Sequence, residues 1–267
     1  MIYKLLFCAV ALFPSLAGAQ TPLTIFGNAT PVTAVDPDTN AVTLGVKFFS
    51  NVGGAISGIR FYRGHTNTSG YTVKLFTVTG SLLASARVRN ETCTPLPCWE
   101  HVNFASPISL SAQTTYIAAY YTSNGRYAGD NNGLVNGAGA APLYAQMCGG
   151  SAGGNGVYTY STGFPNQTYQ CSNYWVDVEF TPNAPTLMMS FNPPNPTIDS
   201  TSPPGTVIAA VVPSWSDGSP FTGGLSFVPP YGNDNGLVAL NGSNVVVNGD
   251  FSGLSNTTQN ATVDATQ

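Results

Sequence analysis

The sequence predicts an all-β protein: two antiparallel β-sandwich modules, jelly-roll or immunoglobulin-like, joined by a proline-rich linker after a signal peptide. Three observations predict it. Only 7% of the 267 residues are charged, too few to cover the outer faces of surface helices. Short alternating segments rich in Val, Ile, Tyr and Phe recur between turn signals. The 29 glycines and 20 prolines suit many tight turns, yet their share is below that typical of disorder.

The first nineteen residues have the pattern of a secretory signal. Lys4 is the positive residue, Leu5 to Leu16 is the apolar run, and a small-residue cleavage site ends at Ala19, before Gln20. The run is too short to span a bilayer, so a retained anchor helix is the weaker alternative. We therefore expect a secreted, periplasmic or cell-surface protein without a transmembrane segment. A net charge of −4 argues against a nucleic-acid partner.

Four cysteines follow the signal: Cys93, Cys98, Cys148 and Cys171. An even number in an oxidising compartment predicts two disulfides, and three pairings are open. The sequential pairing is favoured, because Cys93 and Cys98 bracket a turn-like insert and the other two bracket a glycine-rich excursion. A zinc site is the alternative, but these spacings without a nearby histidine pair fit it poorly.

The first module is expected over residues 22–182. Its predicted strands are Val42 to Phe49, Ile56 to Arg63, Tyr71 to Val78, Leu82 to Arg89, Trp99 to Phe104, Thr115 to Thr122 and Tyr174 to Phe180. Between Gly125 and Asn173 the alternation weakens. That stretch is too long for a plain hairpin loop, so it is either functional or contains short strands.

Seven prolines between Pro182 and Pro204 predict a stiff, extended linker over residues 183–205. A small sandwich is expected over residues 206–267, with a start near 186 as the alternative. Its predicted strands are Thr206 to Val212, Gly224 to Val228, Leu237 to Leu240, Asn244 to Val247 and Ala261 to Ala265.

Several motifs are familiar. Leu44-Gly45-Val46-Lys47-Phe48, Gly58-Ile59-Arg60-Phe61-Tyr62-Arg63 and Asn173-Tyr174-Trp175-Val176-Asp177-Val178 stand in the order typical of one bacterial family. The chain resembles, roughly from Thr24 to Pro182, the family called domain of unknown function 4082. The resemblance implies an exported β-sandwich module, found beside immunoglobulin-like repeats and sometimes attached to enzymes. It supplies no catalytic residues, and the four cysteines are not part of the family's pattern.

The C-terminal segment resembles cadherin-like or immunoglobulin-like repeats more loosely. The resemblance rests on Pro204-Gly205-Thr206-Val207 and Asn241-Gly242-Ser243-Asn244-Val245, among others. The acidic calcium-binding motifs of cadherins are missing, which argues against calcium between domains.

No catalytic constellation stands out. Gly149-Gly150-Ser151-Ala152-Gly153 matches the nucleophile-elbow pattern, but both histidines precede Ser151 and no helix is expected after it. Asp177 and Glu179 lie two apart on a predicted strand and share one face, which we interpret as an exposed acidic face that could also pair with Lys47 or Arg60. We expect the protein not to be an enzyme.

Calcium is the one cofactor that the sequence brings into question. Asp36, Asp38 and Asn40 resemble the opening of a calcium loop, but the glycine and the bidentate acid of an EF-hand are replaced by Ala41 and Lys47. A looser calcium site in a sandwich loop competes with a solvated turn.

The tyrosines and asparagines of the loop-rich stretch are the predicted ligand-binding residues. Tyr127, Tyr158 and Tyr160 offer aromatic faces, and Asn131, Asn132 and Asn155 offer hydrogen bonds, as a sugar ring requires. The same rings could equally fill a thin core with their hydroxyls at the rim. We expect an exported, non-catalytic binding module for a carbohydrate or another extracellular ligand. A structural or adhesive protein that binds a surface protein is the alternative, and a hydrolase ranks third.

Overall fold

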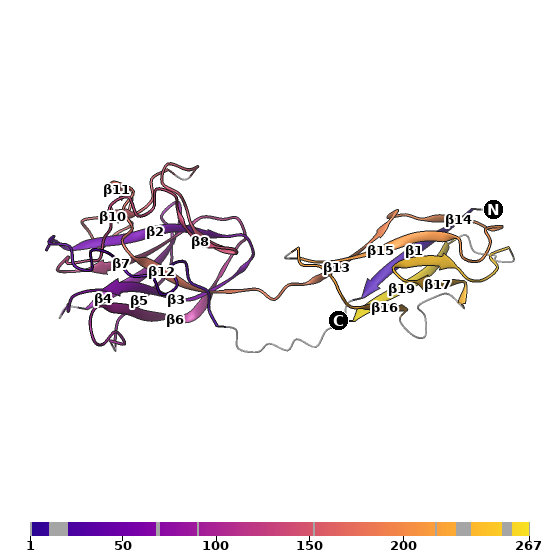
Figure 1. The fold of residues 1–267 in the computed structure, drawn as a ribbon, viewed down its shortest axis with the longest axis horizontal. Coiled ribbons are helices and arrows are strands. Elements are labelled where there is room, and N and C mark those ends of the chain that lie inside the picture. The colour runs from indigo at the N-terminus through magenta and orange to yellow at the C-terminus, as the bar shows by residue number, and fades with distance from the viewer. Residues whose placement is uncertain are drawn as a thin grey trace. The chain divides into compact units, whose positions relative to one another are not determined.

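The computed structural model describes residues 2–10, 21–67, 70–89, 91–151, 153–216, 218–227, 236–252 and 258–266. The chain divides into two compact units (Figure 1). The first spans Ala19–Asn183, and the second spans Ala184–Gln267 together with the N-terminal strand. Within the described residues all named elements are β-strands and none is an α-helix, so the predicted all-β class is confirmed.

The first unit contains two antiparallel sheets. Its strands are β2 (Val42–Ser50), β3 (Gly54–Arg63), β4 (Tyr71–Thr77), β5 (Leu82–Arg87), β6 (Cys98–Leu110), β7 (Tyr116–Thr122), β8 (Ala138–Ala140), β9 (Leu143–Ala145), β10 (Val157–Thr159), β11 (Gln167–Thr168) and β12 (Val176–Pro182). One sheet has the order β11-β10-β2-β7-β4-β5, with β9 beside β2 and β8 beside β9. The other has the order β12-β3-β6.

The two sheets of this unit enclose one hydrophobic core. Phe48 on β2, Leu75 on β4 and Tyr120 on β7 come from the larger sheet, and Phe61 on β3 and Phe180 on β12 come from the smaller one. Phe61 and Tyr120 stack with ring centroids 4.2 Å apart. Alternation along β6 buries one face and exposes the other, as expected for a half-buried strand.

Turn chemistry sets the hairpin between β4 and β5. The amide of Gly80 donates to the carbonyl of Thr77, and the amide of Thr77 donates to the carbonyl of Ser81. Gly80 has φ +96°, a conformation that glycine adopts without steric cost. A turn at Thr79-Gly80 thus connects the two strands.

The loop-rich stretch from Gly125 to Asn173 contains the short strands β8 to β11. The Cys148–Cys171 disulfide closes it, and a second disulfide joins Cys93 to Cys98. The sequential pairing is therefore confirmed. The amide of Leu134 also donates to the carbonyl of Cys171, which ties the middle of the stretch to the bridge.

The second unit also consists of two sheets. Its strands are β1 (Ile2–Val10), β13 (Leu187–Asn192), β14 (Thr197–Asp199), β15 (Val207–Trp215), β16 (Gly224–Phe227), β17 (Val238–Asn241), β18 (Asn244–Val247) and β19 (Thr258–Thr266). The sheet orders are β13-β15-β18-β17 and β14-β1-β19-β16. Ile208, Val245 and Phe251 belong to its separate core. Its cadherin-like or immunoglobulin-like character stays a prediction.

The predicted linker over residues 183–205 is not a plain spacer in this structure. It contains β13 and β14, and the second unit begins at Ala184, close to the alternative start near 186. Both strands lie at sheet edges, and the prolines lie outside them: Pro185 before β13, Pro193, Pro194 and Pro196 between the two strands, and Pro203 and Pro204 after β14. The prolines therefore flank and separate two short edge strands instead of forming one continuous linker.

Strand β1 consists of residues that the sequence predicts to belong to a signal peptide. It pairs with β14 and, in parallel, with β19, and Figure 1 shows it in indigo among the orange and yellow strands of the second unit. Ala19 and Gln20, between which cleavage is predicted, lie outside the described residues. Cleavage stays a prediction, and it would remove β1 from this sheet.

Candidate ligand-binding site

Asn155, one of the predicted ligand residues, is buried beneath the loop that follows β9. Its Oδ1 accepts from the amides of Lys47 and Gly156, at 2.8 and 2.7 Å. Its Nδ2 donates to the carbonyls of Lys47 and Gln146, at 3.0 and 2.7 Å. Because β2 pairs with β10 on one side of Lys47 and with β9 on the other, the Asn155 amide fills the gap between these two ladders. All its hydrogen-bonding capacity serves the fold, so we leave it out of the proposed site.

Three predicted ligand residues lie in one row of rings, which we call the tyrosine cluster: Tyr127, Tyr174, Tyr158 and Tyr160. Successive ring centroids are 5.8, 6.2 and 5.7 Å apart, each pair close to edge-to-face. Tyr174 is buried, and Tyr127 and Tyr158 pack partly buried against the core, while Tyr160 is 56% exposed. Most of the cluster therefore fills the core, and one ring reaches the surface.

Burial also controls ionisation within the tyrosine cluster. Burial raises the pKa of Tyr127 and that of Tyr174 well above the usual value for a phenol. The carboxylates of Asp36 and Asp38 oppose ionisation of Tyr127 further. These hydroxyls therefore stay protonated at neutral pH and can act as hydrogen-bond donors.

The predicted calcium segment lies beside the tyrosine cluster. Asp36 accepts from the amide of Asp38, and Asp38 accepts from the amide and the side chain of Asn40, as in consecutive Asx turns. The Tyr160 hydroxyl donates to Asp38 at 2.9 Å. Burial would raise the pKa of Asp38, but the hydrogen bonds from Asn40, Tyr160 and Tyr127 outweigh it and lower that pKa.

A calcium ion at Asp36, Asp38 and Asn40 stays a prediction, and the contacts seen there are those of a hydrogen-bonded turn. Asn40 turns its amide nitrogen toward Asp38. Across the part of the chain that the structure describes, no group of three His, Cys, Asp or Glu side chains could hold a metal ion. The segment forms a turn that is satisfied by its own hydrogen bonds.

Asn131 and Asn132, the remaining predicted ligand residues, lie in an exposed turn after Asp130. The side-chain oxygen of Asn131 accepts from the Ser172 hydroxyl at 3.0 Å. Asn132 has φ +62°, and its amide donates to the carbonyl of Gln170. Both residues connect this turn to the strand-poor segment before β12.

Asp177 and Glu179 do not form the exposed acidic face that we expected. Asp177 is fully buried and pairs with Arg60 at 2.7 Å, and the Arg60 guanidinium lies 4.2 Å from the centroid of the Trp99 ring. Glu179 pairs with His101 at 2.6 Å. The loop before β2 covers Asp177, because the amides of Ile25 and Phe26 both donate to its carboxylate. Alternation along one strand could not reveal that cover.

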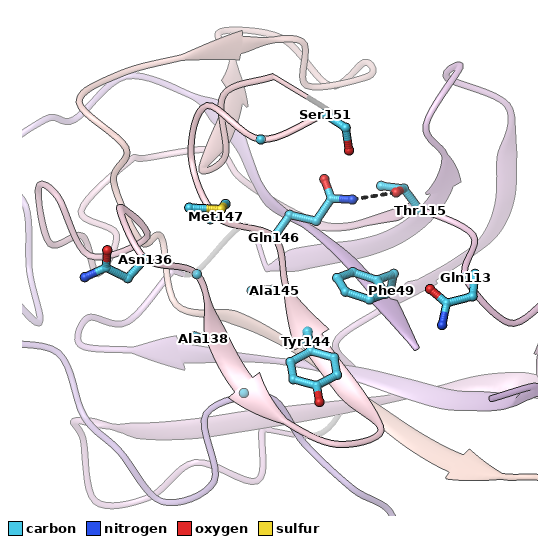
Figure 2. Close-up of a pocket in the computed structure, with 13 residues that line it drawn as sticks. Phe49, Gln113, Thr115, Asn136, Ala138, Tyr144, Ala145, Gln146, Met147 and Ser151 are labelled. Atoms are coloured by element: carbon cyan, nitrogen blue, oxygen red, sulfur yellow. Dashed lines mark hydrogen bonds between the residues drawn. The ribbon is translucent and has the colours of Figure 1, made fainter. Parts of the chain in front are cut away.

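The main pocket of the first unit lies elsewhere, on the outer side of β2. Its volume is about 740 Å³, within the range that small ligands occupy. The β8–β9 hairpin, the end of β2 and the turn before β7 surround it, and the turn after Gln146 closes one side. Figure 2 shows the residues that line it.

Two stacked aromatic rings form the apolar part of the pocket. Phe49 and Tyr144 have ring centroids 5.4 Å apart and an interplanar angle of 22°. Phe48 and Phe49 are neighbours on β2 and so face opposite sides of the sheet: Phe48 enters the core and Phe49 faces the pocket. Both pocket rings are only partly buried, so each keeps surface available for contact.

Neutral polar groups surround these rings. Gln146 donates to the Thr115 hydroxyl at 2.7 Å, the dashed contact in Figure 2, and Gln113 donates to Asn51 at 3.2 Å. Asn136 and Ser151 lie farther out on the same pocket (Figure 2). No residue that lines the pocket is charged.

Backbone geometry and a disulfide fix the walls of the pocket. Gly139, on β8, has φ +94°, and a Cβ atom there would lie 2.4 Å from the carbonyl oxygen of Leu143. Only glycine therefore lets β8 lie this close to β9. On the other side Met147 precedes Cys148, whose bridge to Cys171 anchors that wall.

The sequence alone did not single out Phe49, Tyr144 or Gln146. Tyr144 lies in the same tyrosine-containing stretch as the predicted residues, but nothing local distinguishes it from them. The Phe48-Phe49 pair is the signal that could have been used, because one of two adjacent aromatic residues on a strand must face away from the core.

The first unit is thus defined as a two-layer antiparallel β-sandwich with two disulfides and one uncharged, aromatic pocket. Residues 28–176 match the family described as domain of unknown function 4082 (DUF4082), and this range is more than half of the chain. The chain belongs to that family, which confirms the resemblance seen in its motifs. No curated protein matches the chain. In the described residues, no helix is long and apolar enough to cross a membrane.

Proposed function

We propose that this chain is an exported, non-catalytic binding module that holds an uncharged carbohydrate in the pocket around Phe49 and Tyr144. The single observation that carries the proposal is the stacked ring pair set among amide and hydroxyl side chains. Aromatic rings supply apolar contact to the C–H face of a sugar, and amides and hydroxyls supply hydrogen bonds to its hydroxyl groups.

The lining supports an uncharged ligand over a charged one. Recognition of a carboxylate, sulfate or phosphate is strongest when an Arg or Lys forms a charge-assisted hydrogen bond with it. No such residue lines this pocket. A neutral hexose or pentose chain needs no cation and matches the available side chains.

The two disulfides support the proposed compartment. Such bridges persist in oxidising surroundings outside the cytosol. Together with the predicted signal, they favour a protein that is secreted, periplasmic or held at the cell surface.

The lining also supports binding without catalysis. Acid–base and nucleophilic mechanisms need a His, Asp, Glu, Lys or activated nucleophile near the substrate. Of the residues that line this pocket, only Thr115, Tyr144 and Ser151 carry hydroxyls, and no His, Asp or Glu lines it beside them. A hydrolase is therefore the least supported of the three functions.

A structural or adhesive role is the second candidate. It is favoured by the presence of two β-units, each with its own hydrophobic core, as in proteins that display binding surfaces on stable modules. In that role the partner would be a surface protein, and the pocket would have no carbohydrate ligand.

A glycan array probed with the full chain tests the two candidates. We expect retention on neutral polysaccharides or their oligosaccharides, with weaker signals for the uronate and sulfated members of the array. Calorimetric titration of the best ligand then gives its affinity. If no glycan is retained while the protein still associates with cell surfaces, the adhesive role replaces the proposed one.

A further inference from the structure

Positive charge is scarce in this chain, and its placement is uneven. The sequence contains only 8 Lys and Arg residues. Arg60 and Arg63 are buried and paired with Asp177 and Glu100. Lys74 donates to the carbonyl of Thr162. Arg87 and Arg89, in contrast, are exposed, and neither has an acidic partner among the described residues.

Arg87 and Arg89 border a groove between the two sheets of the first unit. The groove has a volume of about 570 Å³ and lies between β5, with the residues after it, and β6. Ala86, Val88 and Phe104 face the core and form its floor. By strand alternation the two arginines lie on the outward face of one wall, while the exposed His101 and Asn103 lie on that of the other.

The acidic side chain next to the groove is that of Glu179 on β12. It pairs with His101, which lines the groove, at 2.6 Å. The two arginines therefore dominate the local charge. An anionic group would gain charge-assisted hydrogen bonds from them. This preference is opposite to that of the uncharged pocket around Phe49, so the groove is a separate feature of the surface.

Both walls of the groove are edge strands. In the described part of the chain β5 pairs only with β4, and β6 pairs only with β3. Each wall therefore presents a row of backbone N–H and C=O groups without a strand partner. Such an edge accepts an additional extended chain, whose backbone completes the ladder.

We infer that this groove binds an acidic, extended peptide segment of a partner protein, which adds a strand along β5 and places its carboxylates beside Arg87 and Arg89. The edge amides and carbonyls favour a peptide over an acidic polysaccharide, since only a peptide backbone matches their spacing. The paired arginines favour glutamate or aspartate at alternate positions, because residues two apart on a strand share a face.

Four probes separate strand pairing from charge attraction. The first is an eight-residue peptide of alternating glutamate and threonine, and the second replaces each glutamate by lysine. The third is the acidic peptide with every backbone nitrogen methylated, which keeps its charges but removes its donors. The fourth is polygalacturonate, an acidic polysaccharide. We expect the full chain to bind the first probe and to bind the other three at least about tenfold more weakly, because each lacks either the charge or the ladder.

Paired variants locate the site. Arg87→Gln combined with Arg89→Gln should lower the affinity for the acidic peptide about fivefold, the scale expected for two exposed ion pairs. The melting temperature should not fall. Arg126→Gln removes an exposed arginine outside the groove and should leave the affinity unchanged.

The inference is overturned if the methylated peptide or polygalacturonate binds as well as the acidic peptide. Equal effects of Arg126→Gln and the double variant also overturn it, because they show non-specific attraction. The inference is also overturned if the double variant self-associates but keeps its affinity for the peptide. The arginines would then only prevent the β5 edge from pairing with another copy of the chain.

Discussion

Buried polar side chains connect the loops of the first unit to its two sheets. Asn155 completes the hydrogen bonding of β2 at Lys47, and Asp177 receives the amides of Ile25, Phe26 and Val178 besides the Arg60 guanidinium. Each satisfied group avoids the cost of burying an unpaired donor or acceptor. The same residue types in the same stretch would have suited a ligand site, so burial alone distinguishes the two roles.

The Arg60–Asp177 pair should contribute strongly to stability once it is formed. Asp177→Ala leaves a buried guanidinium unpaired and should lower the free energy of unfolding by about 3–5 kcal/mol. Glu179→Ala, which removes the partly exposed contact with His101, should cost less than about 1 kcal/mol. Denaturant titration of the full chain measures both. Equal losses for the two variants would contradict the distinction between buried and exposed pairs.

Tyrosine ionisation should limit stability at alkaline pH. The pKa of Tyr71 is raised to about 12, mainly by burial; Arg63 opposes the rise, and Glu91 and Glu100 contribute to it. A phenol in the unfolded chain ionises near pH 10, so the unfolded state loses its proton first. The contribution of Tyr71 is therefore intact below about pH 10 and is lost as the pH rises toward about 12.

Thermal melting across this alkaline range, followed together with phenolate absorbance, checks the prediction. For the buried rings, phenolate absorbance should appear only as the protein unfolds. The melting temperature of the Tyr71→Phe variant should fall less steeply as the pH rises, although the variant loses the hydrogen bond to the His65 carbonyl. Full ionisation of the tyrosines near pH 10 with the fold intact would show that burial does not protect them.

At the scale of elements, strand positions followed from the sequence. The predicted strand at Val42 to Phe49 corresponds to β2, and that at Asn244 to Val247 coincides with β18. Alternation and glycine turns are local signals, so they can be recognised in the sequence before the fold is known. Strands β8 to β11 were not located, because two or three residues are too few to show a period.

The pocket could not be derived in the same way. It combines β2, the β8–β9 hairpin and two turns that only the sheet order brings together. The sequence analysis expected aromatic rings with amides at a ligand site, but it assigned that role to residues that largely fill the core. Which ring faces outward depends on register, and register is a property of the assembled sheet.

The two disulfides should have separable effects. Cys148→Ser with Cys171→Ser opens a segment with a sequence separation of 23 and should cost about 3.5 kcal/mol by the loop-entropy model. The other bridge spans a separation of only 5, and its removal should cost about 2 kcal/mol.

Ligand affinity separates these double variants more sharply than stability does. Loss of Cys148–Cys171 should also weaken glycan binding, since Met147 and Ser151 on the adjoining wall would lose their anchor. Loss of Cys93–Cys98 should leave affinity unchanged. If both affect binding alike, the bridge does not organise the pocket.

For the whole chain, the expected end of the first module at residue 182 lies next to the boundary after Asn183, but residues 183–205 were assigned to a linker. The prolines that suggested a linker belong to a region containing edge strands β13 and β14. These prolines lie outside both strands, so their number fits a linker as well as turns between short strands. The choice between them depends on neighbouring strands that are distant in sequence.

The first unit should fold without the second. A fragment of residues 22–183 keeps both disulfides, the core and the contact between the Asn183 amide and the Gly53 carbonyl. Produced in an oxidising compartment, it should give a dispersed amide spectrum and keep the glycan affinity of the full chain. A collapsed spectrum that is restored only by adding residues 184–267 would show that the units depend on each other.

Carbohydrate binding at the Phe49–Tyr144 pocket is the function proposed for the whole chain. Tyr144→Ala removes one stacked ring. It should lower the affinity for the best neutral glycan about three- to tenfold, because an aromatic contact contributes about 0.5–1.5 kcal/mol. Tyr160→Ala and Tyr169→Ala remove rings that are 56% and 53% exposed but lie outside the pocket, so they are the matched controls.

Calorimetric affinity for these three variants, read beside their melting temperatures, is the most direct test. We expect Tyr144→Ala alone to lose affinity and all three variants to keep nearly the melting temperature of the unmodified chain. Loss of affinity in Tyr160→Ala with Tyr144→Ala unaffected would move the site to the tyrosine cluster and contradict the claim.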